Sequence, residues 1–146
     1  RAQTADSTLN DLDSFAIPLA QGWNQISIPL QPAESHIGQI LASIEGSYEL
    51  LYAYDGCQDN SWLKYDPNAP LFVNTLKEID PTMGLWINMT QADTLLVSGT
   101  QPQQTSIRLC RGWNLIGYPG QNQQSSQILT FYSSQSHNES FLCLKF

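Results

Sequence analysis

Charged residues are scarce in this chain of 146 residues. They make up 13% of the sequence, with 6 Lys+Arg against 13 Asp+Glu and a formal net charge of -7, whereas a typical soluble domain has about 25% charged residues. A protein that binds nucleic acid needs clustered cations to neutralise phosphates. The composition therefore excludes nucleic acid as a partner.

Long apolar segments are also missing. No stretch approaches the ~18 consecutive apolar residues that span a bilayer, and no basic amphipathic segment is present. We therefore expect no membrane insertion. The hydrophobic share of 41% is nevertheless large enough for one domain with a core.

Cysteine and histidine are few. The three cysteines are Cys57, Cys110 and Cys143, and the two histidines are His36 and His137. This is too sparse for a disulfide scaffold, and the absence of Cys-x-x-Cys excludes a zinc site of the common spacings. A Cys57–Cys110 bridge stays open as one of several pairings. We predict no metal and no cofactor.

Local catalytic motifs are absent as well. The sequence has no Gly-x-Ser-x-Gly, no His-Glu-x-x-His and no glycine-rich phosphate loop. Carboxylates such as Glu45, Glu49, Asp55 and Asp59 are present, but thirteen acids in any chain supply a pair somewhere. We predict no catalytic residue and lean against an enzyme, although a small secreted glycan hydrolase without a local motif stays an alternative.

Acidic residues in the turn segments are interpreted as structural. Asp55, Asp59 and Asn60 share one loop, but they lack the alternating spacing and the distal glutamate of a calcium loop. Asp66 and Asp80 each precede a proline, and this pairing is typical of turns.

The strongest positive feature is an internal repeat. Residues 16–29, AIPLAQGWNQISIP, recur at 106–119 as SIRLCRGWNLIGYP. The two segments, here called the first and the second head, share Ile, Leu, Gly-Trp-Asn, Ile and Pro at seven positions. The similarity then fades, so the second copy is a stub of a repeat.

Apolar and polar residues alternate in short runs, which is typical of strands. Each head alternates on both sides of its glycine and predicts a hairpin of two strands. Further strands are expected at 50–54, 62–65, 84–90, 94–98 and 105–110, separated by segments rich in turn-forming residues. We predict a mainly β fold, an antiparallel β-sandwich or small barrel-like module.

One short helix is expected at about 35–45. Ser35 can cap it, and Gly46 is placed as its C-terminal stop. His36 is interpreted as a solvated polar residue in the first turn. The apolar residues at helical spacing are Ile37, Ile40, Leu41 and Ile44.

Three segments are expected along the chain. Residues 1–14 lack periodicity and are interpreted as a linker or disordered lead-in, and residues 15–120 as one β module closed by the second head. Residues 121–146 are interpreted as a truncated second repeat or an atypical tail.

Several motifs follow one another along the chain. They are Gly22-Trp23-Asn24, Tyr54-Asp55, WLKYDP at 62–67, GLWINMT at 84–90 and GWNLIGYP at 112–119. Together they resemble repeat modules of large secreted and cell-surface bacterial proteins, over about 105 residues that stop before the tail. Such modules accompany surface-layer, protease and polysaccharide-degrading domains. The resemblance therefore implies an extracellular or cell-surface accessory role, with neighbouring modules of a larger protein as partners, and it carries over no catalytic residue.

Aromatic residues supply the candidate site. Because successive side chains of a strand point to opposite faces, Trp86 and Asn88 lie opposite the apolar side of their strand. By the same alternation, Trp62 shares the polar side of its strand with Lys64, and two tyrosines share one side of theirs. If these strands pair, the rings form an aromatic strip suited to sugar rings. The predicted carbohydrate-binding residues are Tyr52, Tyr54, Trp62, Lys64, Trp86 and Asn88.

Trp23 and Trp113 are interpreted differently because both recur within Gly-Trp-Asn. We expect the glycine to allow a positive-φ turn, the tryptophan to cover the end of the core, and the asparagine amide to satisfy backbone groups of the turn. These residues are thus predicted to serve the fold.

The function predicted from the sequence is a non-catalytic extracellular accessory module that binds polysaccharide or a cell-envelope glycan. Many neutral amides and hydroxyls and few charges suit neutral sugars. The alternative is a structural spacer or adhesion module whose repeats stack end to end without a small ligand. A binder keeps Trp62 and Trp86 exposed in a coplanar row, whereas a spacer buries them between modules.

Overall fold

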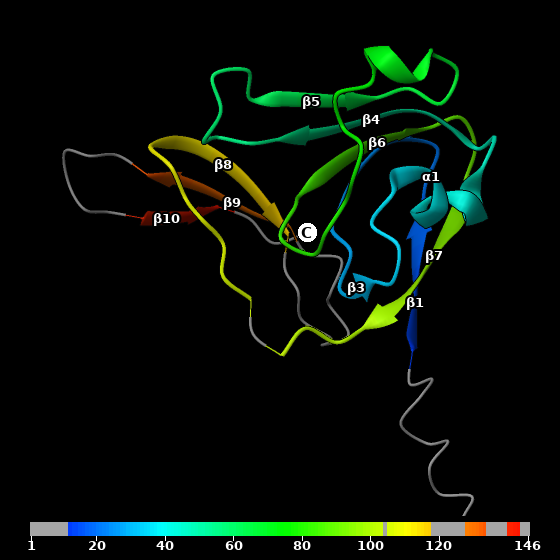
Figure 1. The fold of residues 1–146 in the computed structure, drawn as a ribbon, viewed down its shortest axis with the longest axis horizontal. Helices are drawn as coiled ribbons and strands as arrows, with labels where there is room; N and C mark the ends of the chain where they lie inside the picture. The colour runs from blue at the N-terminus through cyan, green and yellow to red at the C-terminus, as the bar shows by residue number, and fades with distance from the viewer. Residues whose placement is uncertain (1–11, 104, 118–127, 134–139, 144–146) are drawn as a thin grey trace, which may run out of the picture.

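The computed structural model describes residues 12–103, 105–117, 128–133 and 140–143 (Figure 1). These residues form antiparallel sheets with one short helix, and none of the described sheets closes into a barrel. The predicted fold class, a mainly β module with one short helix, is confirmed.

Two sheets build the module, and we call them the small and the large sheet. The small sheet has the order β1-β7-β3, from β1 (Asp13–Leu19), β7 (Asp93–Thr100) and β3 (Gln31–Pro32). The large sheet has the order β2-β6-β4-β5, and all its pairs are antiparallel. Its strands are β2 (Gly22–Ile26), β6 (Leu85–Met89), β4 (Tyr48–Tyr54) and β5 (Trp62–Tyr65).

A third sheet joins β8 (Gly112–Gly117), β9 (Ile128–Ser133) and β10 (Ser140–Cys143) in the order β10-β9-β8. Its β8 is the part of the second head that begins at the glycine of Gly-Trp-Asn. The beginning of β8 lies beside the loop between β4 and β5, as Figure 1 shows.

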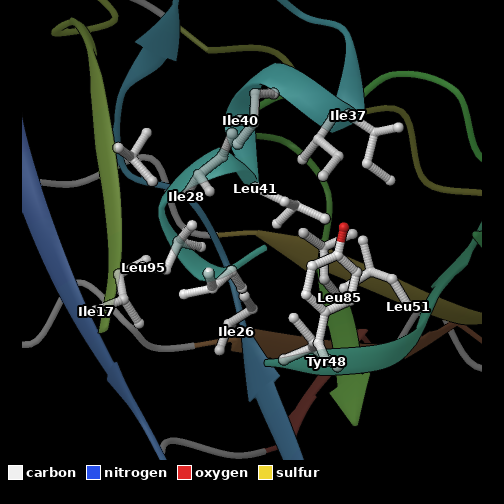
Figure 2. Close-up of a cluster of buried hydrophobic side chains, with 14 of the residues drawn as sticks. Ile17, Ile26, Ile28, Ile37, Ile40, Leu41, Tyr48, Leu51, Leu85 and Leu95 are labelled. Atoms are coloured by element: carbon white, nitrogen blue, oxygen red, sulfur yellow. The ribbon is translucent and has the colours of Figure 1, made fainter. Parts of the chain in front are cut away.

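The core lies between the small and large sheets (Figure 2). Strand alternation sends Ile17 and Leu95 inward from the small sheet. It sends Ile26, Leu51 and Leu85 inward from the large one. Each is at most 2% exposed, and full burial of such a side chain stabilises the fold by about 1.5–3 kcal/mol.

The predicted helix is present but shorter than expected. It consists of α1 (Ile37–Ile40), followed by the 3₁₀ turn η2 (Ala42–Ile44). Gly46 follows with φ 82°, as its expected role as a stop requires. The four apolar residues at helical spacing are buried, namely Ile37, Ile40, Leu41 and Ile44.

The cap of this helix differs from the prediction. His36, and not Ser35, is the N-cap, and its Nδ1 accepts the N–H of Gly38. An imidazole nitrogen can replace a hydroxyl here because the cap needs only an acceptor within reach of the first turn. The His36 side chain is exposed, as expected.

The predicted hairpin within the first head is wrong. β1 pairs with β7 in the small sheet, whereas β2 pairs with β6 in the large sheet. The head therefore arches from one sheet to the other. A hairpin would leave Ile17 and Ile26 side by side on one sheet, whereas the arch turns both toward the core from opposite sides, where each is buried.

The strand predicted at 105–110 is also wrong, since these residues form no strand. The second head is therefore no hairpin either. The segment 105–110 corresponds to β1 of the first head. In the first head, β1 is paired with β7 over all its residues, so the segment 105–110 would need a similar partner strand. Among the described residues, no strand takes that place for the second head. Alternation alone does not make a strand when no neighbour completes the ladder.

The other predicted strands are confirmed with small shifts at their ends. Those at 50–54, 84–90 and 94–98 correspond to β4, β6 and β7, and the one at 62–65 corresponds to β5. β1 begins at Asp13, before the expected start of the module at residue 15. Residues 1–11 of the predicted lead-in lie outside the described residues, as does most of the predicted tail at 121–146.

Candidate ligand-binding face

The outer surface of the large sheet carries a cluster of aromatic side chains. On each strand, alternate residues point into the core, and the residues between them point outward. In β6 the inner positions are all buried, so Trp86 and Asn88 point outward. The same alternation brings further residues to this surface: Trp23 and Gln25 of β2, Tyr52 and Tyr54 of β4, and Trp62 and Lys64 of β5.

Strand register brings these side chains together. Tyr52 is paired with Trp86 on one side and with Lys64 on the other. Tyr54 is paired with Trp62 at the beginning of β5. The six residues singled out in the sequence therefore lie on one face. We call it the aromatic face, and it also includes Trp23, Gln25 and the neighbouring Trp113 of β8.

The rings pack against one another but do not lie in a plane. The ring centroids of Trp23 and Tyr52 are 6.0 Å apart at an angle of 31°. Trp62 meets Tyr52 at 6.1 Å and 86°, and Tyr54 at 5.0 Å and 70°. Edge-to-face packing is favourable because the positive edge of one ring contacts the negative face of the other. The coplanar row of rings that the sequence analysis expects of a binder is therefore not observed for these rings, which are inclined to one another.

Two hollows lie between these inclined rings. The first, of about 390 Å³, is lined by Trp23, Tyr52, Trp62 and Trp86. The second, of about 400 Å³, is lined by Trp62 and Trp86 again, together with Gln25, Tyr54, Trp113, Asn114 and Leu115. Because two tryptophans line both, the hollows adjoin. The lining residues of the second hollow include the neutral amide of Gln25 and no carboxylate.

The exposure of the predicted residues differs. Trp62 is 53% exposed, as expected, whereas Trp86 and the two tyrosines are half-buried by their neighbours. Asn88 donates its amide to the carboxylate of Glu49. Lys64 is exposed at the rim and lies 4.0 Å from Asp66, a surface pair that contributes little stability.

Trp23 and Trp113 correct one prediction from the sequence. They were expected to cover the end of the core, but Trp23 is 53% and Trp113 57% exposed. Both belong to the aromatic face. The signal was present in the alternation, because Trp23 lies opposite the buried Ile26 and Trp113 opposite the buried Ile116.

The remaining predictions for Gly-Trp-Asn are confirmed. Gly22 has φ 92° and Gly112 has φ 97°, a region that glycine adopts without strain. The Asn24 side chain accepts the N–H of Ala20 at 3.0 Å and donates to the carbonyls of Ala20 and Gly22 at 2.7 and 3.0 Å. Asn114 makes the same three bonds within the second head, at the same distances. The two heads therefore share one turn.

A disulfide joins Cys57 to Cys110, so the bridge that the sequence left open is formed. Cys57 lies in the loop after β4, and Cys110 lies just before β8. The bond ties the second head to the large sheet. Disulfides persist in oxidising surroundings, so this bond indicates a compartment outside the reducing cytosol.

Another cavity, of about 310 Å³, lies beside the disulfide and is lined in part by the carboxylates Asp55 and Asp80. Both carboxylates are engaged in turns. Asp55 accepts the N–H of Cys57, and Asp80 accepts the N–H of Thr82.

The two Asp-Pro pairs behave as predicted. Besides Asp80, the carboxylate of Asp66 accepts the N–H of Asn68, two residues on, at 2.9 Å. The prediction that these acids are turn elements is confirmed.

The loop at 55–60 carries Asp55, Asp59 and Asn60. Within the described ranges, no group of three or more His, Cys, Asp and Glu side chains could hold a metal ion.

Two ionisable side chains away from the aromatic face have shifted pKa values. Burial, with a contribution from Tyr65, raises the pKa of the Tyr48 hydroxyl well above its ordinary value. A hydrogen bond from Ser47 and another from the N–H of Thr94 lower the pKa of the exposed Asp93. Neither shift belongs to a residue that lines one of the two aromatic hollows.

No protein-family model, no curated protein and no solved structure matches this chain. Among the described helices, none is long and apolar enough to cross a membrane.

Proposed function

We propose that the protein is a non-catalytic extracellular module that binds a neutral polysaccharide or cell-envelope glycan on its aromatic face. The observation that carries this proposal is the gathering of Trp23, Tyr52, Trp62, Trp86 and Trp113 around two adjoining hollows on one surface. Exposed apolar patches of this kind mark interaction sites.

The chemistry of the face favours a sugar over an ionic ligand. The C–H groups of a pyranose ring pack against aromatic faces, and a few polar groups then take its hydroxyls. Gln25 lines the second hollow and Asn88 lies on the same face, so their amides supply the polar groups, whereas the Asn114 amide is bonded within its own turn. Lys64 is the one cation among the side chains assigned to this face, and it lies at the rim beside Asp66.

The extracellular setting is supported by the disulfide, because such bonds persist in oxidising compartments. It also agrees with the resemblance of the repeat motifs to modules of large bacterial surface proteins. In that setting the protein would hold a neighbouring domain against its glycan.

The proposal is tested by titrating the domain with hydroxyethylcellulose, laminarin, xylan and mannan while following tryptophan fluorescence. We expect saturable binding of at least one polysaccharide. Trp62→Ala should weaken it by about tenfold or more, as loss of a central aromatic contact does. The matched control is Phe72→Ala, which removes an 86% exposed ring from the turn that follows β5.

The proposal would be contradicted if Trp62→Ala and Phe72→Ala bound the polysaccharide with equal affinity. Circular dichroism must show that both variants are folded. Absence of binding to every polysaccharide would also contradict the proposal. Release of reducing ends during incubation would instead favour the glycan hydrolase, and Asp55→Asn and Asp80→Asn would then be the variants to compare.

The second candidate is a structural spacer or adhesion module. It is favoured by the covalent fastening of the second head to the large sheet through Cys57–Cys110. A spacer buries its exposed rings against a neighbouring module. Attachment of a second module would then protect Trp23, Trp62 and Trp113 from acrylamide quenching, whereas a binder keeps them accessible.

A further inference from the structure

The second hollow of the aromatic face is shared between the two copies of the repeat. Its first-copy lining is Gln25, Tyr54, Trp62 and Trp86, and its second-head lining is Trp113, Asn114 and Leu115. The first hollow, by contrast, is lined by first-copy residues alone. The face is therefore complete only when the second head is docked.

Close backbone contacts hold the second head at its first end. A Cβ on Gly56, in the loop after β4, would lie 2.2 Å from the carbonyl oxygen of Trp113. No side chain larger than that of glycine fits there without a backbone shift. The neighbouring Asn114 is 3% exposed although its turn carries an exposed tryptophan.

A second set of contacts holds the other end of β8. The Gly117 N–H donates to the carbonyl of Thr82 at 2.8 Å, and Ile116 forms an antiparallel bridge with Met83. A Cβ on Gly117 would lie 2.4 Å from the carbonyl oxygen of Pro81. The second head is thus fixed at both ends of its strand.

The two heads differ in sequence where the second one docks. At the position of Ala20 in the first head, the second has Cys110, which forms the disulfide. At the position of Ser27 it has Gly117, which permits the close approach to the loop before β6. Both differences serve the docking.

A further difference serves the hollow itself. At the position of Gln25 in the first head, the second has Leu115, which lines the second hollow. Where the first head has the polar Gln25, the second head thus has the apolar Leu115, two positions after Trp113. The shared turn is adapted in the second head to present an apolar surface to the first copy.

We propose that the second head completes a composite glycan site of two subsites, with Trp113 and Leu115 as the wall of the second subsite and the Cys57–Cys110 disulfide as its fastening. This rests on the proposed glycan-binding function and deepens it. The occupant is a neutral chain long enough to pass Trp62 and Trp86 and to fill both hollows. In this proposal the shortest oligosaccharide occupies the first hollow, whose lining consists of four aromatic side chains.

The experiment compares oligosaccharides of two to six units, taken from whichever of the four polysaccharides binds, by isothermal titration calorimetry. In the intact protein, we expect affinity to rise by about tenfold or more from the shortest to the longest oligosaccharide as the second hollow is filled. Trp113→Ala should abolish this gain with length while leaving the affinity for the disaccharide within about threefold.

Trp23→Ala is the matched control, because Trp23 stands in the same turn with nearly the same exposure but lines the first hollow. It should weaken the disaccharide and the longest oligosaccharide alike. The folded Cys57→Ser/Cys110→Ser variant should lose the gain with length, as Trp113→Ala does. If that variant does not fold, Trp113→Ala alone decides.

The failures are distinguishable. If the intact protein binds no oligosaccharide or polysaccharide, the proposed function and the composite site both fall. If it binds, and Trp62→Ala weakens binding while Trp113→Ala keeps the full gain with length, the function stands and the composite site is refuted.

Discussion

Single residues decide the shape of the turn that the two heads share. The asparagine of Gly-Trp-Asn uses its carbonyl and its amide together, so the neighbouring backbone groups are paired without a strand partner. Glycine at a positive φ and asparagine at this position therefore recur for a local reason. The tryptophan between them is exposed in both heads and belongs to the aromatic face.

Asn24→Ala is expected to lower the free energy of unfolding by about 1–3 kcal/mol, because it removes three hydrogen bonds and leaves backbone groups of the arch unpaired. Urea denaturation measures the loss. Asn60→Ala, at an exposed asparagine in the β4–β5 loop, should change stability by less than about 0.5 kcal/mol. Equal effects of the two substitutions would refute the role of the Asn24 side chain.

The buried Tyr48 predicts a stability loss in alkali. Its pKa is raised in the folded protein, so above the ordinary tyrosine pKa of about 10 the unfolded chain releases a proton that the folded one keeps. Stability is thus fully present below pH ~10 and falls as pH rises above it. Thermal unfolding between about pH 8 and pH 11 should show a steeper decline for the intact protein than for Tyr48→Phe. Parallel declines would contradict the assignment.

At the scale of elements, apolar residues of the sheets lie on two kinds of surface. Those on the inner surfaces are buried in the core, and those on the outer surface of the large sheet form the aromatic face. The inner residues alternate with the residues of the aromatic face along β2, β4 and β6. A second exposed apolar element is the 3₁₀ turn η3 (Leu71–Val73), whose Leu71 and Phe72 are 76% and 86% exposed. Burial, rather than residue type, decides which of these elements stabilises the fold.

Leu71→Ser/Phe72→Ser is therefore expected to leave the free energy of unfolding within about 0.5 kcal/mol of the intact protein. Leu51→Ala, in contrast, should cost about 2–5 kcal/mol, because Leu51 is fully buried in the core. Chemical denaturation of the two variants side by side checks this. A large loss from the η3 variant would show that this turn is covered in solution.

At the scale of the whole molecule, the disulfide connects parts that are 53 positions apart in the sequence. The segment between them contains β5, β6 and β7, so the bond closes a loop that includes strands of both sheets. It therefore restricts the unfolded chain as well as fastening the second head.

Loss of the bond is expected to cost about 4 kcal/mol, by the dependence of chain entropy on loop length. Urea unfolding with and without a reducing agent measures it. The Cys57→Ser/Cys110→Ser variant should match the reduced protein and should not respond to the reductant. A reduced protein as stable as the oxidised one would show that the bond does not constrain the unfolded chain.

Much of this molecule follows from its sequence alone. Alternation of apolar and polar residues predicts β4, β5, β6 and β7, because burial of one sheet face imposes a period of two. The same period places Trp62, Trp86 and the two tyrosines on one outer face. The recurrence of Gly-Trp-Asn predicts the shared turn, since its hydrogen bonds join residues at most four positions apart.

Only the tertiary structure decides which strands pair and which loops meet. The first head is an arch rather than a hairpin because its two strands bury their apolar sides from opposite sheets. The segment at 105–110 is not a strand because no described strand pairs with it as β7 pairs with β1. Trp113 joins the aromatic face through contacts made across the fold, by the disulfide and by the close approaches at Gly56 and Gly117. These outcomes depend on long-range packing, which local sequence patterns do not encode.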